Sequence, residues 1–220
     1  EGLEPYHGTY VSSRQDANAF EIFFSQWGDY LFKYEEETYG TQKLLSFANW
    51  PETDPLINEV SPKLSVQSVT ENTEAFIDLE NLQLSDQVKS GMFASYNVYP
   101  YFPTCLQYGK YTEYIDDEGN RNPYRKYLME LVVHHSCPVI ISEYGVPASR
   151  SPAYKDVWRN LSQGGNTETE QGIALLKMYE DIQKAGCAGS MVFTWQDEWF
   201  KRSWNEKSLS NPDGRASWSN

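Results

Sequence analysis

"CPVIISEYGVPASR", residues 137–150, has the pattern of a buried strand that ends in a carboxylate. The apolar run 139–141 is typical of a strand covered on both faces, and Glu143 follows it almost at once. An ionised carboxylate is costly to bury without a partner. Glu143 therefore either pairs with a structural counter-charge, such as Arg150, or lies at the mouth of a site that needs a carboxylate.

Helices alternate with short apolar strands on both sides of this stretch. Further strands are expected at 43–50, 91–100 and 189–195, and helices at 18–40, 124–135 and 168–186. Residues 75–84 form either a short strand or a helical turn, and the long loops are 51–74, 103–123 and 147–166. Such alternation predicts an α/β fold with parallel strands in right-handed βαβ units.

The first and last expected helices carry boundary signals. Asn18 can cap the first and Gly40 ends it, while Thr167 and Glu170 form a capping-box pattern for the last. Large apolar side chains recur along the first helix at helical spacing: Phe20, Phe23, Phe24, Trp27, Leu31 and Tyr34. This pattern predicts an amphipathic helix of about six turns over 18–40.

Polar and aromatic residues gather just after the strands, at Asn49, 96–99, Glu143 and 196–198. In a (β/α)8 barrel this end of the strands holds the active site, and in a doubly wound sheet it holds the ligand crevice. The loops there lack a GxGxxG or GxxxxGK[ST] pattern, which disfavours a nucleotide. Only four or five strands are expected where a barrel needs eight, so we interpret residues 1–220 as one domain, part of a barrel and a fragment of a longer protein.

Composition narrows the range of partners. The 220-residue chain has a net charge of −13, which repels phosphate backbones and anionic lipid, and no apolar run could span a bilayer. Neither nucleic acid nor membrane contact is expected from this segment. Aromatic residues make up 15% of the chain, which suits either a Tyr- and Trp-rich core or platforms that stack on sugars.

No metal or organic cofactor is expected. Three cysteines give neither a disulfide framework nor a CxxC pair, and the compartment stays open, with an extracytoplasmic or cell-surface location favoured. The histidines, His7, His134 and His135, lack metal-ligand spacing, because two adjacent residues point to different faces of a helix. We interpret them as surface or hydrogen-bonded side chains.

Three motifs together carry a resemblance. "VIISEYG", preceded by "FASYNVYPY" and followed by "MVFTWQDEWFKRSWN", resembles the C-terminal half of a retaining glycoside hydrolase with a clan A (β/α)8 barrel, in particular the bacterial family 2-like barrel domains. The likeness covers strands five to eight and most of the chain, including "SFANWPETDPL". It implies a partial barrel, an oligo- or polysaccharide substrate, and hydrolysis of an O-glycosyl bond.

The resemblance also assigns roles to residues. Glu143 matches the nucleophile that ends strand seven, Tyr99 the tyrosine that hydrogen-bonds it, and Trp195 the indole beneath the sugar. The family pattern has His where this chain has Asn97, which leaves the hydrogen bonds around the nucleophile open. Further candidates for substrate binding are Asn97, Tyr96, Glu198 and Asn49.

The acid/base carboxylate has two placements. In the family it ends strand four, which either lies upstream of Glu1 or is the "NWPE" segment, with Glu52 as the acid/base. We favour the first, because Trp50 and not Glu follows Asn49. Asp197 and Glu198 either pair with Lys201 and Arg202 one turn later or, for one of them, bind sugar hydroxyls.

Three hypotheses follow. The chain is part of a glycosidase with no turnover by itself; or a glycan-binding module on a degenerate barrel, with Trp195, Trp199 and the tyrosines as its surface; or a structural α/β domain in which Arg150 or Arg202 pairs with Glu143. Because half a barrel leaves strand edges open, its partner is the remaining half or another copy of the chain. The sugar and the linkage cannot be inferred from the sequence.

Overall fold

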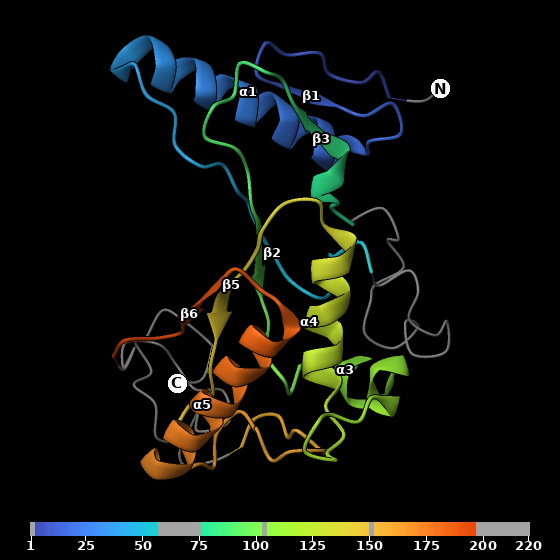
Figure 1. Cartoon of the computed structure of the whole chain (residues 1–220), viewed down its shortest axis with the longest axis vertical. Coiled ribbons are helices and arrows are strands. Elements are labelled where there is room, and N and C mark those ends of the chain that lie inside the picture. The colour runs from blue at the N-terminus through green and yellow to red at the C-terminus, as the bar shows by residue number, and fades with distance from the viewer. Residues whose placement is uncertain (1–2, 57–75, 103–104, 150–151, 197–220) are drawn as a thin grey trace, which may run out of the picture.

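A four-stranded parallel sheet forms the centre of the molecule (Figure 1). The computed structural model describes residues 3–56, 76–102, 105–149 and 152–196. In spatial order the strands are β2 (Ala48–Asn49), β4 (Ala94–Asn97), β5 (Val139–Tyr144) and β6 (Gly189–Val192). The predicted α/β class with parallel strands is confirmed. The structure therefore shows an α/β fold with a parallel sheet. Parallel strands in chain order occur both in barrels and in open sheets.

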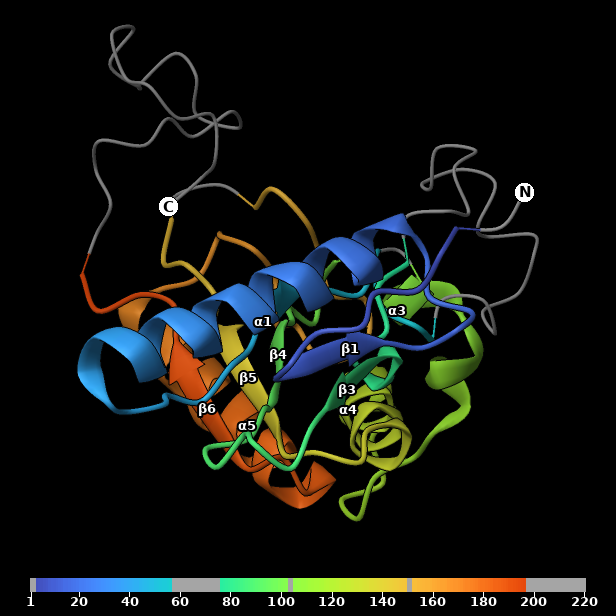
Figure 2. The same ribbon diagram turned by 90° about the horizontal axis from the view of Figure 1, so that it is seen from above.

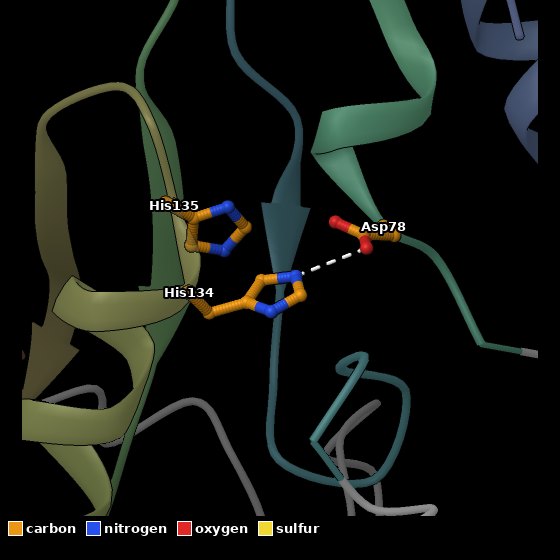
Figure 3. Close-up of side chains that lie close together, drawn as sticks. All are labelled: Asp78, His134 and His135. Carbon is orange, nitrogen blue, oxygen red and sulfur yellow. Dashed lines mark hydrogen bonds and ion pairs between the residues drawn. The ribbon is translucent and has the colours of Figure 1, made fainter.

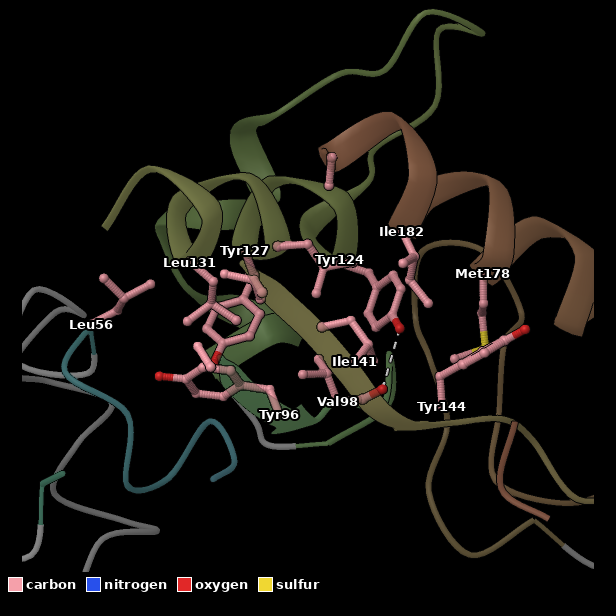
Figure 4. Close-up of a cluster of buried hydrophobic side chains, with 14 of the residues drawn as sticks. Leu56, Tyr96, Val98, Tyr124, Tyr127, Leu131, Ile141, Tyr144, Met178 and Ile182 are labelled. Atoms are coloured by element: carbon pink, nitrogen blue, oxygen red, sulfur yellow. Dashed lines mark hydrogen bonds between the residues drawn. The ribbon is translucent and has the colours of Figure 1, made fainter. Parts of the chain in front are cut away.

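Two long helices provide the crossovers between neighbouring strands. They are α4 (Pro123–His134), between β4 and β5, and α5 (Glu168–Ala185), between β5 and β6. Figure 4 shows side chains on or just after the strands packed beneath them: Tyr96 lies beside Tyr127 and Leu131 of α4, and Tyr144 lies beside Met178 of α5. The Tyr124 hydroxyl donates to the carbonyl of Val98 at 3.3 Å. The main core therefore lies on the helix-covered face of the sheet.

A second layer lies at one end of the sheet (Figures 1 and 2). It consists of α1 (Ala19–Tyr39) packed on an antiparallel pair, β1 (Val11–Ser13) and β3 (Leu82–Leu84). The turn η2 (Leu79–Asn81) leads into β3, so residues 75–84 contain both alternatives that the sequence left open, a helical turn and a strand. β1 was not predicted, because three residues are too few to show an alternating pattern.

The ends of α1 are confirmed, but its aromatic stripe faces outward. Asn18 and Glu21 form a capping box, and Gly40 ends the helix in the left-handed conformation with φ of 63°. Its large apolar side chains that are at least one-third exposed are Phe20, Phe23, Trp27, Tyr30, Leu31, Tyr34 and Tyr39, whereas Phe24 of the predicted stripe is partly buried against the core. The buried face instead carries Asp29, which accepts the backbone N–H groups of Tyr10 at 2.6 Å and Val11 at 3.0 Å. Hydrogen bonds to the start of β1 therefore fix this helix together with two of its inward rings, Phe32 in the core and Phe24 stacked on Phe47.

Two short helical elements occupy part of the predicted loop at 103–123, and each contributes a core side chain, Leu106 and Tyr111. α3 (Cys105–Tyr108) and η3 (Lys110–Glu113) pack near α4. The predicted loop at 51–74 lies largely outside the described residues. Three of the predicted strands are longer than the observed ones: 43–50 shortens to two residues, and 91–100 and 189–195 to four each, whereas the run 139–141 lies within the six-residue β5. Among the described residues no helix is long and apolar enough to cross a membrane.

A buried ionic network joins α4 to α5. Asp181 has no exposed surface and accepts hydrogen bonds from Asn122 Nδ2 at 2.8 Å, from Arg125 Nε at 2.8 Å, and from Arg159. Arg125 is itself almost fully buried. Since a charge buried without a partner is costly, this network fixes how the two helices pack on the sheet.

Candidate active site

Glu143 lies near the end of β5, beside a tyrosine from the segment that follows the neighbouring strand β4. The Tyr99 hydroxyl donates to Glu143 Oε2 at 2.7 Å, within the range of a charge-assisted hydrogen bond. Both side chains are partly buried. The resemblance implies a tyrosine hydrogen bond to this glutamate, and the structure contains one.

An irregular stretch of β5 turns Glu143 away from the helices. The pairing of β5 shifts register between Ile141 and Tyr144 on its β6 side, and next to Glu143 on its β4 side. Ile141 and Tyr144 are three residues apart, yet both are buried among the side chains beneath the helices (Figure 4). In a regular strand only residues an even number apart share a face. The irregularity therefore leaves Ser142 and Glu143 off the helix-covered face.

Gly145 lets β6 approach the chain directly after this irregularity. A Cβ at this position would lie 2.5 Å from the carbonyl oxygen of Phe193, and the N–H of Phe193 donates to the carbonyl of Tyr144 at 2.9 Å. Contacts below 3.0 Å require something to shift, and here the atom in the way belongs to the backbone. The glycine of the "SEYG" motif thus allows the close packing of β5 against the segment after β6.

Two tyrosines near Glu143 remain protonated. Burial raises the pKa of Tyr99 far above its ordinary value, and the hydrogen bond and charge of Glu143 raise it further. Burial and the Glu143 charge likewise raise the pKa of Tyr101, whose ring lies 5.5 Å from that of Tyr99 between centroids. A tyrosine that keeps its proton donates to the carboxylate. Tyr99 can therefore orient Glu143 at any physiological pH.

Asn97 takes part in a chain of hydroxyl hydrogen bonds. Ser95 Oγ donates to Ser142 Oγ at 2.8 Å, and Ser142 Oγ donates to Asn97 Oδ1 at 2.8 Å. Asn97 pairs in register with Glu143. Neither serine was predicted from the sequence to be part of the site. The available signal was Ser142, which stands between the apolar run and Glu143. Asn97 thus lies beside Glu143, at the position where the resemblance leads one to expect His.

Tyr96 and Asn49 do not join this group of side chains. Tyr96 is buried on the helix-covered face (Figure 4). Its hydroxyl lies 2.8 Å from Nε2 of His135. Asn49 is buried at the end of β2, where its Oδ1 accepts from the Trp50 N–H at 2.9 Å and from the Thr53 hydroxyl at 2.6 Å. These side-chain hydrogen bonds of Tyr96 and Asn49 involve neither Glu143 nor Tyr99.

Of three further predicted groups, the structure describes two, Trp195 and Glu52. Trp195 is 95% exposed in the segment after β6, and Glu198 lies outside the described residues. Glu52 follows β2 at the same edge of the sheet and is half-buried, and burial raises its pKa. That direction suits a proton donor, because a general acid must hold its proton near neutral pH.

Glu143 forms no ion pair with any Lys or Arg among the described residues. Arg150 and Arg202, the counter-charges named in the structural hypothesis, both lie outside them. Tyr99 is the hydrogen-bond partner of the carboxylate in this part of the chain. The arrangement is a carboxylate held by a neutral hydroxyl, which leaves its negative charge available to a ligand.

The comparisons with known proteins give no match. Profiles of protein families, curated protein sequences and solved structures all lack a significant similarity to this chain. Function therefore has to be argued from the site itself.

Proposed function

We propose that this chain is the C-terminal half of the (β/α)8 barrel of a retaining glycoside hydrolase, with Glu143 as its nucleophile. The observation that carries the proposal is the 2.7 Å hydrogen bond from Tyr99 to Glu143, made between side chains at the carboxyl ends of neighbouring parallel strands. In barrel enzymes the catalytic groups come from this end of the strands.

The chemistry follows from the two groups. The Glu143 carboxylate attacks the anomeric carbon of an oligo- or polysaccharide and forms a glycosyl-enzyme ester, while a second carboxylate about 5–5.5 Å away protonates the leaving oxygen. That second group then activates the water that hydrolyses the ester. Tyr99 holds the attacking carboxylate in one orientation throughout, since its pKa keeps it protonated.

The strand order supports strand four as the source of the second carboxylate. If β5 is strand seven of a barrel, then β4 is strand six and β2 is strand five. Glu52 follows β2 and so comes one strand too late for the family's acid/base. This favours an acid/base upstream of Glu1, with Glu52 as the alternative whose raised pKa speaks for it.

One pair of observations favours a binding module as the second candidate. Asn97 replaces the expected His and gives its Oδ1 to Ser142, and the highly exposed indole of Trp195 offers a face for a sugar ring. A module of this kind would hold glycans near Trp195 without forming an ester at Glu143.

Covalent trapping separates the two candidates. We would treat the protein extended to a complete barrel with activated 2-fluoro glycosides of several sugars and digest it for mass spectrometry. A retaining enzyme gains the mass of one sugar on the peptide that contains Glu143, and the adduct is lost in Glu143→Gln but kept in Glu180→Gln, an exposed carboxylate on α5. Reversible glycan binding without an adduct supports the module and contradicts the enzyme.

The 220-residue chain alone is expected to show no turnover of aryl glycosides. The reason is that it lacks half of the barrel and, by the strand count, the acid/base. Hydrolysis by the purified chain that disappears in both Glu143→Gln and Glu52→Gln would overturn this expectation and assign the acid/base role to Glu52.

A further inference from the structure

Five side chains with metal-binding atoms gather where α4 ends and β5 begins. They form two overlapping sets, Asp78 with His134 and His135, and Glu80 with His135 and Cys137. Within each set the ligand atoms lie within 4.8 Å of one another. Figure 3 shows both imidazole rings and the Asp78 carboxylate facing the same space, with His134 Nε2 3.0 Å from Asp78 Oδ2.

The end of α4 explains why adjacent histidines converge. His134 is the last helical residue, whereas His135 has an extended backbone with φ of −86° and ψ of 136°. The two side chains are therefore no longer separated by the 100° turn of a helix, which the sequence-based argument had assumed. Asp78, the N-terminal cap of η2, brings a carboxylate from 56 positions away along the chain.

We propose that Asp78, His134 and His135 bind one divalent transition-metal ion of the zinc type. Metal–ligand bonds of about 2.0–2.2 Å in a tetrahedral site place neighbouring ligand atoms about 3.3–3.6 Å apart. The 3.0 Å separation of His134 and Asp78 is close to that spacing, so little movement admits an ion. Two imidazoles and one carboxylate form a common donor set for such ions and leave one position to water.

Glu80 supplies the supporting contact that metal-bound histidines usually have. Nδ1 of His135 lies 3.3 Å from Glu80 Oε1, which directs the other ring nitrogen, Nε2, to the metal. The Glu80 carboxylate is itself held by Ser136, through its backbone N–H at 3.0 Å and its hydroxyl at 2.7 Å. The carbonyl end of α4 adds partial negative charge, which favours a cation there.

Tyr96 is the competitor for the same nitrogen. Its hydroxyl lies 2.8 Å from Nε2 of His135, so the ion must displace this hydrogen bond when it binds. This gives a specific expectation: Tyr96→Phe removes the competitor and tightens metal binding, whereas it would have no such effect if His135 had only a structural role.

The second set is disfavoured as the primary site. Burial raises the pKa of the Cys137 thiol, and the Glu80 carboxylate is already held by three donor groups. A thiolate ligand would also give a distinct spectroscopic signature, which the experiment below records.

Titration of the chelator-treated protein with Co²⁺ tests the proposal. We expect visible d–d bands that saturate at one ion per chain, no thiolate charge-transfer band, and displacement of the ion by Zn²⁺. His134→Ala and Asp78→Asn should abolish the bands, and asparagine at 78 keeps the capping acceptor of η2. Glu80→Gln should weaken binding roughly 10–100-fold.

Matched controls decide between the outcomes. His7→Ala removes an exposed histidine and Cys137→Ser a neighbouring thiol, and both should bind Co²⁺ as the unaltered chain does. The far-ultraviolet circular dichroism of each variant shows that it is folded. Absence of saturable binding, equal binding by His7→Ala and His134→Ala, or loss of binding in Cys137→Ser would each overturn the assignment.

Discussion

At the scale of single residues, Asp181 is the buried charge on which the packing of α4 and α5 depends. It accepts from Asn122 and from two arginines and has no exposed surface. Removing one member of a buried ionic network leaves the others charged and unpaired, which costs about 3–5 kcal/mol.

We therefore expect Asp181→Ala to lower the free energy of unfolding by about 3–5 kcal/mol in urea titrations. The neighbouring Glu180→Ala, on the exposed face of α5, should stay within about 0.5 kcal/mol of the parent. Similar losses in both variants would contradict the structural role of the network.

Asp116 should make the fold sensitive to acid. Burial raises its pKa, but this effect is outweighed by hydrogen bonds from the Asn120 N–H, the Asn122 side chain and the Glu118 N–H, with the charge of Arg125 adding to them, so its pKa lies below the ordinary value. A carboxyl whose folded pKa is depressed adds stability above its unfolded pKa, and this stability is lost as the pH falls through the folded value. The stability that Asp116 contributes is therefore lost in the range below about pH 4.

Urea unfolding across pH 2–7 measures this contribution. Asp116→Asn should reduce the dependence of the unfolding free energy on pH in the acid range, because asparagine does not titrate. An unchanged pH dependence would assign the acid sensitivity to other carboxylates.

At the scale of elements, the end of β5 is shaped by close approach of the backbone. Gly145→Ala would place a methyl group 2.5 Å from the Phe193 carbonyl, so β5 and the segment after β6 must separate. We expect a loss of stability of about 1–3 kcal/mol, the usual cost of overpacking. Gly119→Ala is the control, since open space surrounds that glycine, although its φ of 82° adds some strain of its own. Equal losses in the two variants would mean that the contact with Phe193 has no effect.

The helices could be predicted better than the strands, for reasons that differ between elements. Asn18, Gly40, Thr167 and Gly186 are local signals, and the structure uses each of them as a cap. The strands are two to six residues long and their limits depend on tertiary pairing, so the apolar runs gave β2, β4 and β6 too long and β5 too short. The sequence also could not predict that the aromatic stripe of α1 faces outward, because the spacing of apolar residues shows that they share a face but not whether this face is buried.

In the candidate site, too, some side-chain positions could be predicted from the sequence and others could not. The sequence placed Tyr99 beside Glu143, and the hydrogen bond between them is present. It could not show that Tyr96 would face the helices, since this depends on the pleat of β4. Nor could it show that Asp78 would reach His134, a contact between residues 56 positions apart.

At the scale of the whole molecule, neither edge of the parallel sheet carries a further strand from the described part of the chain. Among the described residues β2 pairs only with β4, and β6 only with β5. Open strand edges favour pairing with another strand. We expect the isolated 220-residue chain to self-associate, with a light-scattering mass above the 25.4 kDa of one chain. A monomer at every concentration would contradict this.

The outward aromatic stripe of α1 gives this association an unusual dependence on salt. With a net charge of −13, copies of the chain repel one another at low ionic strength, and this repulsion is screened beyond about 10 Å at 0.1 M salt. The exposed rings of Phe20, Phe23 and Trp27 keep their tendency to leave water under the same conditions. Added salt should therefore lower the solubility of the chain. If the copies associated mainly through ion pairs, added salt would instead weaken the association.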